Sequence, residues 1–255
     1  MLDRETLIGA LREGLARAEC VRAAWLGGSD ATRRADAVSD VDLMLVAAAG
    51  RVEDAVAAID AAIAPVARVR LRYRLPQPTW HGFEQAFYQF EDAPEWLMLD
   101  WLVIEQGRAH QWLEVERHGA ARVLLDRDGE IAEAHVDRAA IAAAVRKRVE
   151  DVRVKHALFR HLAPKMAERG LPADAAYFYH SIMLRSLVDL VRAVHCPERH
   201  DYGFRYLERD LPPELYARVC RLCYPAGGAE IPAMAEEADA IIAETLAGWD
   251  AQRRG

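Results

Sequence analysis

Two aspartates near the N-terminus have the spacing of a metal-binding pair. They occur in the run Ser39-Asp40-Val41-Asp42-Leu43, where charged and apolar residues alternate as in a β-strand. Side chains at i and i+2 of a strand point to the same face, with Cα atoms roughly 6.5 Å apart. Two carboxylates held that close repel each other unless a cation lies between them, and hard oxygen ligands suit Mg²⁺ that also holds substrate phosphates. We therefore expect Asp40 and Asp42 to bind Mg²⁺.

A glycine pair precedes the two aspartates. The apolar run 21–26 predicts a strand that ends in Gly27-Gly28-Ser29. Glycine lets the backbone turn sharply and approach a ligand outside the strand end. Ser29 can then offer its hydroxyl and its backbone amide to a phosphate oxygen. Such turns are common, and this one predicts a phosphate site because the Asp pair follows it.

A third carboxylate lies in a strongly apolar run. Residues 96–104, WLMLDWLVI, indicate a strand buried in a sheet, and Asp100 is its single charge. An unpaired carboxylate there is costly, so it needs a partner. One alternative is an arginine of the strand expected over 68–75. The other is that this strand lies beside that of Asp42, so that Asp100 completes a metal site or acts as the base for an attacking hydroxyl.

The three features occur in one order along residues 21–104: the Gly-Ser turn, the Asp-x-Asp strand and the later strand with Asp100. This order resembles the signature of the polymerase-β-like nucleotidyltransferase superfamily. The resemblance implies a domain that binds Mg²⁺ and a nucleoside triphosphate, transfers a nucleoside monophosphate to an acceptor and releases pyrophosphate. It implies catalytic and metal-binding roles for Asp40, Asp42 and Asp100, and nucleotide-binding roles for Gly28, Ser29 and Ser39.

Apolar spacing predicts the elements that position these residues. Leucines at 7, 11 and 15 predict a first helix with Asp3 as N-cap. The spacing over 52–63 predicts a second helix, stopped by Pro65. A helix between strands implies a crossover, and hence strands in one sheet. Further strands are expected over 68–75, 81–90 and 96–104.

The second half of the chain is expected to be nearly all helical. The predicted helices are a long one from about 136 that ends near 170, then 173–194, 203–210, 214–223 and 233–252. The fold class predicted is therefore α+β, with an N-terminal mixed-sheet nucleotidyltransferase domain (1–130) followed by a C-terminal helical bundle (131–255). We expect the active site in a cleft between the two.

Arg185 and Arg192 lie seven residues apart, about two helical turns, so they are expected on one face of the helix over 173–194. One alternative is a solvent-exposed face, with Arg185 and Asp189 as an i,i+4 pair. The other is that the arginines face the cleft, where cations would stabilise a leaving pyrophosphate. Both arginines are therefore candidates for nucleotide binding.

The domain order and helical half also resemble small-molecule nucleotidyltransferases that adenylylate aminoglycoside or lincosamide antibiotics. Those enzymes carry a Ser-Lys pair, whose lysine binds the nucleotide phosphates, ahead of an aromatic residue and a Leu-Pro. The comparable stretch here reads Arg199-His200-Asp201, then Tyr206 and Leu211-Pro212, so the lysine is missing. The resemblance implies that His200 or Arg205 takes its place.

Composition limits the functional classes. With 255 residues, 52% of them hydrophobic, the chain can bury a sizeable core. A net charge of −7 disfavours a dedicated nucleic-acid-binding protein, because phosphate neutralisation needs a concentrated basic surface. No apolar run approaches the ~18 residues of a membrane span, and the N-terminus is charged from its third residue. A cytoplasmic protein is therefore expected.

The sequence thus predicts a Mg²⁺-dependent enzyme that moves AMP from ATP to a hydroxyl of a small molecule, with an aminoglycoside-like antibiotic as a candidate acceptor. Two alternatives stay open. The acceptor could be a protein hydroxyl, as in protein-modifying or antitoxin-type nucleotidyltransferases, or the chain could be a non-catalytic nucleotide-binding module. Three carboxylates disfavour the last alternative, because binding without turnover has no chemical need for all of them.

Overall fold

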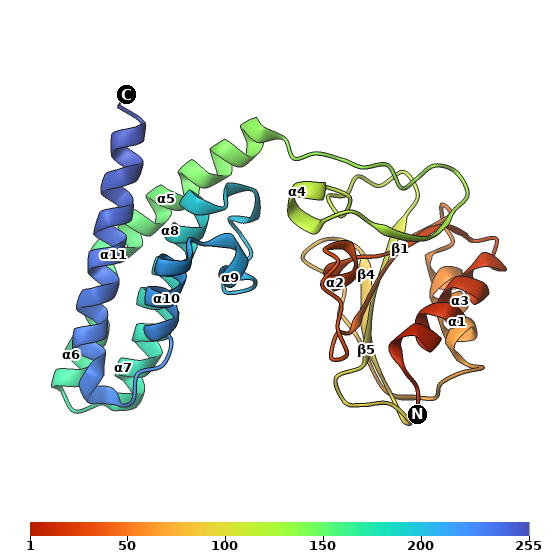
Figure 1. Ribbon diagram of the computed structural model, residues 1–255, viewed down its shortest axis with the longest axis horizontal. Helices are drawn as coiled ribbons and strands as arrows, with labels where there is room; N and C mark the ends of the chain where they lie inside the picture. The colour runs from red at the N-terminus through yellow and green to blue at the C-terminus, as the bar shows by residue number, and fades with distance from the viewer. Residues whose placement is uncertain (255) are drawn as a thin grey trace. The chain divides into compact units, whose positions relative to one another are not determined.

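The computed structural model describes residues 1–254 and has the predicted α+β architecture, a six-stranded mixed sheet followed by helices. The chain divides into two compact units, the first over Met1–Val136 and the second from Asp137 onward (Figure 1). The sheet belongs to the first unit, and the second unit is helical. No helix within residues 1–254 is both long enough and apolar enough to cross a membrane.

The sheet has one parallel pair of strands at its centre. Its order is β3-β4-β5-β2-β1-β6, with β2 and β5 parallel and all other neighbours antiparallel. The crossover expected between strands therefore exists, since α3 lies between β2 and β5 in the sequence. The strands are β1 (Val21–Leu26), β2 (Val41–Ala47), β3 (Val69–Arg74), β4 (Glu84–Phe90), β5 (Met98–Glu105) and β6 (Arg122–Asp126).

Two helices cover one face of this sheet. α1 (Arg4–Ala16) begins after Asp3, whose carboxylate accepts a hydrogen bond from the backbone N–H of Thr6 at 2.8 Å, and the predicted N-cap is confirmed. α3 (Val52–Ile63) has the predicted bounds, and it ends where Pro65 prevents its continuation. Both helices pack against each other and against the sheet (Figure 1).

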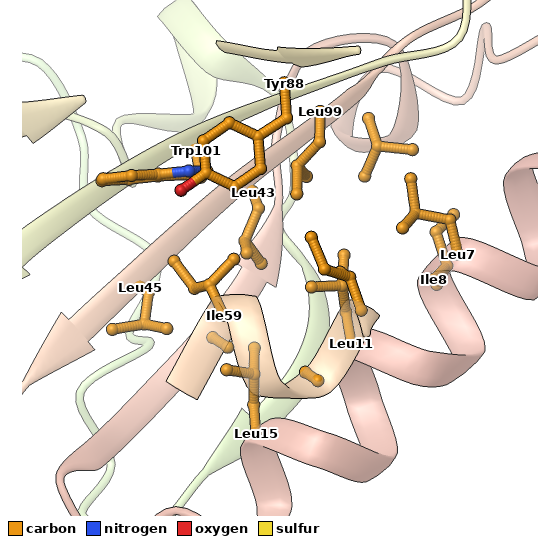
Figure 2. Close-up of a cluster of buried hydrophobic side chains, with 14 of the residues drawn as sticks. Leu7, Ile8, Leu11, Leu15, Leu43, Leu45, Ile59, Tyr88, Leu99 and Trp101 are labelled. Carbon is orange, nitrogen blue, oxygen red and sulfur yellow. The ribbon is translucent and has the colours of Figure 1, made fainter. Parts of the chain in front are cut away.

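The core between helices and sheet fixes which strand residues face away from it. Figure 2 shows leucines of α1 and Ile59 of α3 pointing toward Leu43 and Leu45 of β2. Leu99 and Trp101 of β5 belong to the same buried cluster. Because strand side chains alternate between faces, the residues of β2 and β5 that alternate with these four point to the opposite face of the sheet.

Three short elements of the first unit were not predicted. α2 (Gly28–Ala31) is a single turn directly after β1, and α4 (Val115–His118) is another short turn. The edge strand β6 was also missed, because most of its residues are partly or fully exposed and show no clear alternation.

The second unit is helical as predicted, but its helices are divided into more segments than the five expected. The predicted long first helix is wrong at its end: α5 (Arg138–Phe159) stops early, and a separate α6 (Leu162–Glu168) packs against α7 and α11. The predicted helix over 173–194 is α7 (Pro172–Phe178), a π-helical turn η1 (Tyr179–Leu184) and α8 (Arg185–His195) in succession. The others are η2 (Pro197–Arg199), α9 (Leu207–Asp210), α10 (Pro213–Arg221), η3 (Gly228–Glu230) and α11 (Ile231–Gln252).

Candidate active site

Asp42 and Asp100 are neighbours across the parallel pair of strands. The register of β2 and β5 places Asp42 opposite Asp100, between the pairs Val41–Leu99 and Leu43–Trp101. Those apolar residues are fully buried in the core under α1 and α3. Both aspartates therefore point to the other face of the sheet, from Cα atoms about 5 Å apart.

The partner of Asp100 is a glutamine. Nε2 of Gln85, on β4, donates to Oδ1 of Asp100 at 2.8 Å. The alternative of an arginine partner from β3 is wrong, because β4 lies between β3 and β5. The β3 arginines have other partners: Arg72 pairs with Asp60 at 2.6 Å, and Arg74 with Glu84 at 2.8 Å.

A hydrogen-bonded chain continues from this glutamine. Nε2 of His81 lies 2.9 Å from Oε1 of Gln85, and Nδ1 of His81 accepts from the backbone N–H of Phe83 at 3.2 Å. A neutral imidazole that accepts at Nδ1 carries its proton on Nε2 and donates it to the glutamine. Gln85 is thus fixed with its amide NH₂ toward Asp100, an arrangement that sequence reasoning missed because nothing local marks it.

The Gly-Ser turn touches Asp42. The backbone N–H of Gly27 donates to the carbonyl oxygen of Asp42 at 2.9 Å. Gly28 has a φ of 49°, and a Cβ built on it would lie 1.8 Å from Oδ2 of Asp42. No other amino acid fits this position without displacing that carboxylate. The hydroxyl of Ser29 is buried and has no hydrogen-bond partner among the described residues, so a polar ligand would satisfy it.

Asp40 and Ser39 precede the strand. β2 begins at Val41, so the strand alternation expected for Asp40 does not extend to it. Its backbone carbonyl accepts from Nε of Arg4 at 3.1 Å. The hydroxyl of Ser39 accepts from the backbone N–H of Asp36 at 2.9 Å and donates to its carboxylate at 2.8 Å. That hydroxyl is therefore engaged in a local turn.

Burial is the main cause of a raised pKa at all three carboxylates. Burial raises the pKa of Asp42 to about 7, and the charges of Asp40 and Asp100 act in the same direction. Burial likewise raises the pKa of Asp100 to about 6, against the hydrogen bond from Gln85, while the Asp40 charge adds to the rise. The pKa of Asp40 is also raised, mainly by burial. Acidic groups in this state gain from a cation.

A buried ion-pair cluster holds the turn in place. Asp30 follows Ser29 in α2, and its buried carboxylate pairs with Arg4 of α1 and with Nη1 of Arg122 at the start of β6, the latter at 2.9 Å. The cluster joins three elements that are far apart in the sequence, which is why no pattern predicted it. The one local signal was the charge next to Ser29.

The donor set suits Mg²⁺ held jointly with a ligand. Within residues 1–254, no group of three or more His, Cys, Asp or Glu is arranged as a complete metal site. Mg²⁺ typically binds one or two carboxylates plus substrate phosphates instead of a cage made by protein alone. Asp42 and Asp100 match that pattern, and the unpartnered hydroxyl of Ser29 follows Gly28, which abuts Asp42.

The four candidates from the helical unit separate into different environments. Arg192 is completely buried: Nη1 pairs with Asp210 at 2.5 Å, and Nε donates to the carbonyl of Gly203 at 2.8 Å. The expectation that it faces a nucleotide is wrong, because the segment around α9 packs over this end of α8. Arg185, on the same helix, is exposed and bonds Asp189 at 3.0 Å, as the i,i+4 alternative predicts.

The other two candidates lie outside the regular helices. The guanidinium of Arg205 lies 5.1 Å from the ring centre of Tyr202, and its side chain is exposed. His200 lines a pocket together with Arg185. The structure therefore groups Asp40, Asp42, Asp100, Gly28 and Ser29 in the sheet unit, and Arg185 with His200 in the helical unit.

Comparisons with known proteins add little to this geometry. No protein-family model matches the chain, and no curated protein matches it either. Among solved structures, the chain is similar to an aminoglycoside 6-adenyltransferase from Bacillus subtilis, with 13% identity and a TM-score of 0.35. The alignment covers 96% of this chain and 92% of that one. A likeness at this level carries no argument about function.

Proposed function

We propose that the chain is a nucleotidyltransferase that moves AMP from ATP to a hydroxyl of a small molecule and releases pyrophosphate. The observation that supports this most is the placement of Asp42 opposite Asp100, against a Gly-Ser turn with no room for a side chain at residue 28. The order of these features in the sequence is that of the polymerase-β-like signature described above. Asp100 was expected to join the other carboxylates if its strand lay beside that of Asp42, and β2 and β5 are paired in this way.

The proposed residues have two kinds of role, the binding of phosphates and the transfer of a proton. Asp40 and Asp42 are the proposed ligands of Mg²⁺, and the backbone at Gly28 and the hydroxyl of Ser29 are the proposed contacts to the phosphates. Bound there, Mg²⁺ would neutralise phosphate charge and orient the triphosphate. Asp100 is either a further ligand or the base for the acceptor.

As a base, Asp100 has suitable surroundings. Its pKa of about 6 is close to neutral pH, where a general base works best, and Gln85 fixes the orientation of its carboxylate. Asp100 would take the proton of the acceptor hydroxyl as that oxygen bonds to the α-phosphorus. The bond from the α-phosphorus to the bridging oxygen breaks, and pyrophosphate leaves with the electron pair. Catalysis is then chiefly positioning and charge neutralisation.

A pyrophosphate-release screen tests the proposal. The protein is incubated with Mg²⁺ and ATP and with aminoglycosides, lincosamides, sugars or nucleosides in turn. Release that depends on one of these acceptors is expected from the wild type and from Asp54→Asn. The exposed carboxylate of Asp54, on α3, pairs with Arg51, which precedes that helix. Asp42→Asn should release none.

Two outcomes would overturn the proposal. One is full activity of Asp42→Asn. The other is normal ATP binding without pyrophosphate release for any acceptor, which indicates a non-catalytic nucleotide-binding module. Transfer of label from ATP to a polypeptide of a cell lysate would instead identify a protein acceptor.

A further inference from the structure

A pocket of ≈ 570 Å³ lies within the helical unit and is lined only by residues of that unit. Its walls are formed by α5, the π-helical turn η1, the first part of α8 and His200. π-helical turns are rare and often occur at functional sites. The residues that line it include Lys147, Lys155, Phe159, Ile182, Arg185 and Asp189.

The pocket carries an excess of positive charge. Four lysine and arginine side chains line it, against the two carboxylates of Asp151 and Asp189. Asp189 is already shared between two arginines, Arg148 at 3.3 Å and Arg185 at 3.0 Å. In a protein with a net charge of −7, a basic pocket is a local exception.

The two lysines of the pocket have no ion-pair partner. Among the described residues, neither Lys147 nor Lys155 lies within 4.0 Å of a carboxylate oxygen. Asp151 lies between them at i,i+4 spacing on α5, and one carboxylate cannot neutralise two ammonium groups. Both lysine side chains are exposed and free to meet a ligand.

Apolar groups share the pocket with these charges. Phe159 is 42% exposed at the end of α5, and Ile182 of the π-helical turn is half-buried. An exposed aromatic ring beside unpaired cations suits a ligand that has both an apolar body and a negative charge.

We propose that this pocket binds a small organic anion, a phosphate or carboxylate group on an aromatic or aliphatic body. The anionic group pairs with Lys147 and Lys155, and the body packs against Phe159 and Ile182. The proposal does not rest on the proposed function, because none of the residues that carry it is assigned a role there.

Phenyl phosphate is the probe that combines both features, and titration calorimetry at low ionic strength measures its binding. EDTA is present throughout, so that binding through a divalent cation is excluded. The chain has three lysines, and the third, Lys165 in α6, does not line the pocket and provides the matched control. The double variant Lys147→Gln/Lys155→Gln should bind at least about tenfold more weakly, and Lys165→Gln should bind as the wild type does.

A second variant tests the apolar part of the pocket. Phe159→Ser should reduce the affinity for phenyl phosphate toward that for inorganic phosphate and leave the latter unchanged. Because the substituted side chains are exposed, thermal unfolding is expected to show intact folds. Equal affinity of the double lysine variant and the wild type, or no binding by the wild type, would overturn the proposal.

A competition experiment with ATP shows which kind of anionic ligand the pocket takes. Displacement of phenyl phosphate by ATP in EDTA would indicate that the pocket takes nucleotide phosphates. Binding unaffected by ATP would indicate a separate anionic ligand. Asp42→Asn should bind phenyl phosphate as the wild type does, and loss of binding in that variant would contradict an independent site.

Discussion

Asp42 and Asp100 stand opposite each other in the register of two parallel strands, and both point away from the core beneath α1 and α3. Their neighbours along each strand are fully buried apolar residues, so the two carboxylates have little freedom to separate. The pKa of each is raised, by burial first, to about 7 for Asp42 and about 6 for Asp100. The folded protein therefore disfavours the ionised form of both carboxylates.

Asp42→Asn should stabilise the fold in the absence of divalent cations. The folded state holds the Asp42 proton more tightly than the unfolded chain, because the pKa rises from 3.8 to about 7. Stability from this group is therefore full below pH 4 and is lost as the pH rises to 7. The loss amounts to at most about 4 kcal/mol above pH 7.

Urea unfolding at pH 8 and pH 5 in EDTA measures this effect. The variant should gain more free energy of unfolding over the wild type at pH 8 than at pH 5. The control Asp54→Asn, on an exposed carboxylate, should show no such pH-dependent gain. An Asp42→Asn variant no more stable than the wild type at pH 8 would contradict the electrostatic account of the site.

Gly28→Ala should strongly reduce the rate of transfer while the protein stays folded. The added Cβ would meet Oδ2 of Asp42 at 1.8 Å, so that carboxylate must move. Gly50 is the matched control, because its φ of 71° is also positive and nothing lies within 4 Å of the added atom. Both variants carry backbone strain of about 1–2 kcal/mol, because an L-residue is disfavoured in the left-handed region.

The comparison uses the rate of pyrophosphate release and the melting temperature of both variants. A drop of at least about a hundredfold in rate is expected for Gly28→Ala alone, as for a misplaced catalytic group. Equal activities of the two alanine variants would show that the contact with Asp42 is unimportant.

Gln85→Leu should impair the reaction by releasing Asp100. The hydrogen bond at 2.8 Å orients that carboxylate and holds its pKa down. A bond to a charged group contributes about 1.5–3 kcal/mol, which corresponds to roughly a tenfold to hundredfold lower rate. The acidic limb of the pH-rate profile should shift to higher pH.

The matched control is Gln89→Leu on the same strand, whose side chain bonds Arg70 and the backbone of Glu95 instead. It should leave the profile unchanged. If Gln85→Leu also keeps the wild-type profile, Asp100 does not depend on this contact.

Arg192→Met should destabilise the helical unit without a direct effect on the site. Its guanidinium is fully buried on Asp210, and removal of one partner of such a pair typically costs about 3–5 kcal/mol. Arg185→Met removes an exposed i,i+4 contact, worth about 0.5 kcal/mol. Chemical denaturation of both variants gives the comparison, and equal stabilities would refute the structural role of Arg192.

The features that were predicted best from the sequence are those determined by residues close to one another in the chain. The bounds of α3 and the cap of α1 follow from apolar spacing, Pro65 and Asp3. The partner of Asp100 could not be predicted, because it depends on β4 lying between β3 and β5, a pairing between segments remote in the chain.

The environments of the two arginine candidates in the helical unit could not be predicted from the sequence for the same reason. Arg185 and Arg192 share a helix face by spacing, yet one is exposed and the other is fully buried. The difference comes from the later segment that ends in Asp210, which covers one end of α8. Burial by a distant segment leaves no periodic signal in the helix that it covers.

The fate of the ATP phosphates tests nucleotidyl transfer most directly. ATP labelled at the α-phosphate or at the γ-phosphate is supplied with Mg²⁺ and an acceptor that supports pyrophosphate release. We predict that the α label appears on the acceptor and the γ label in pyrophosphate, and that EDTA or Asp42→Asn abolishes both. Transfer of the γ label to the acceptor, or its release as inorganic phosphate, would contradict the account.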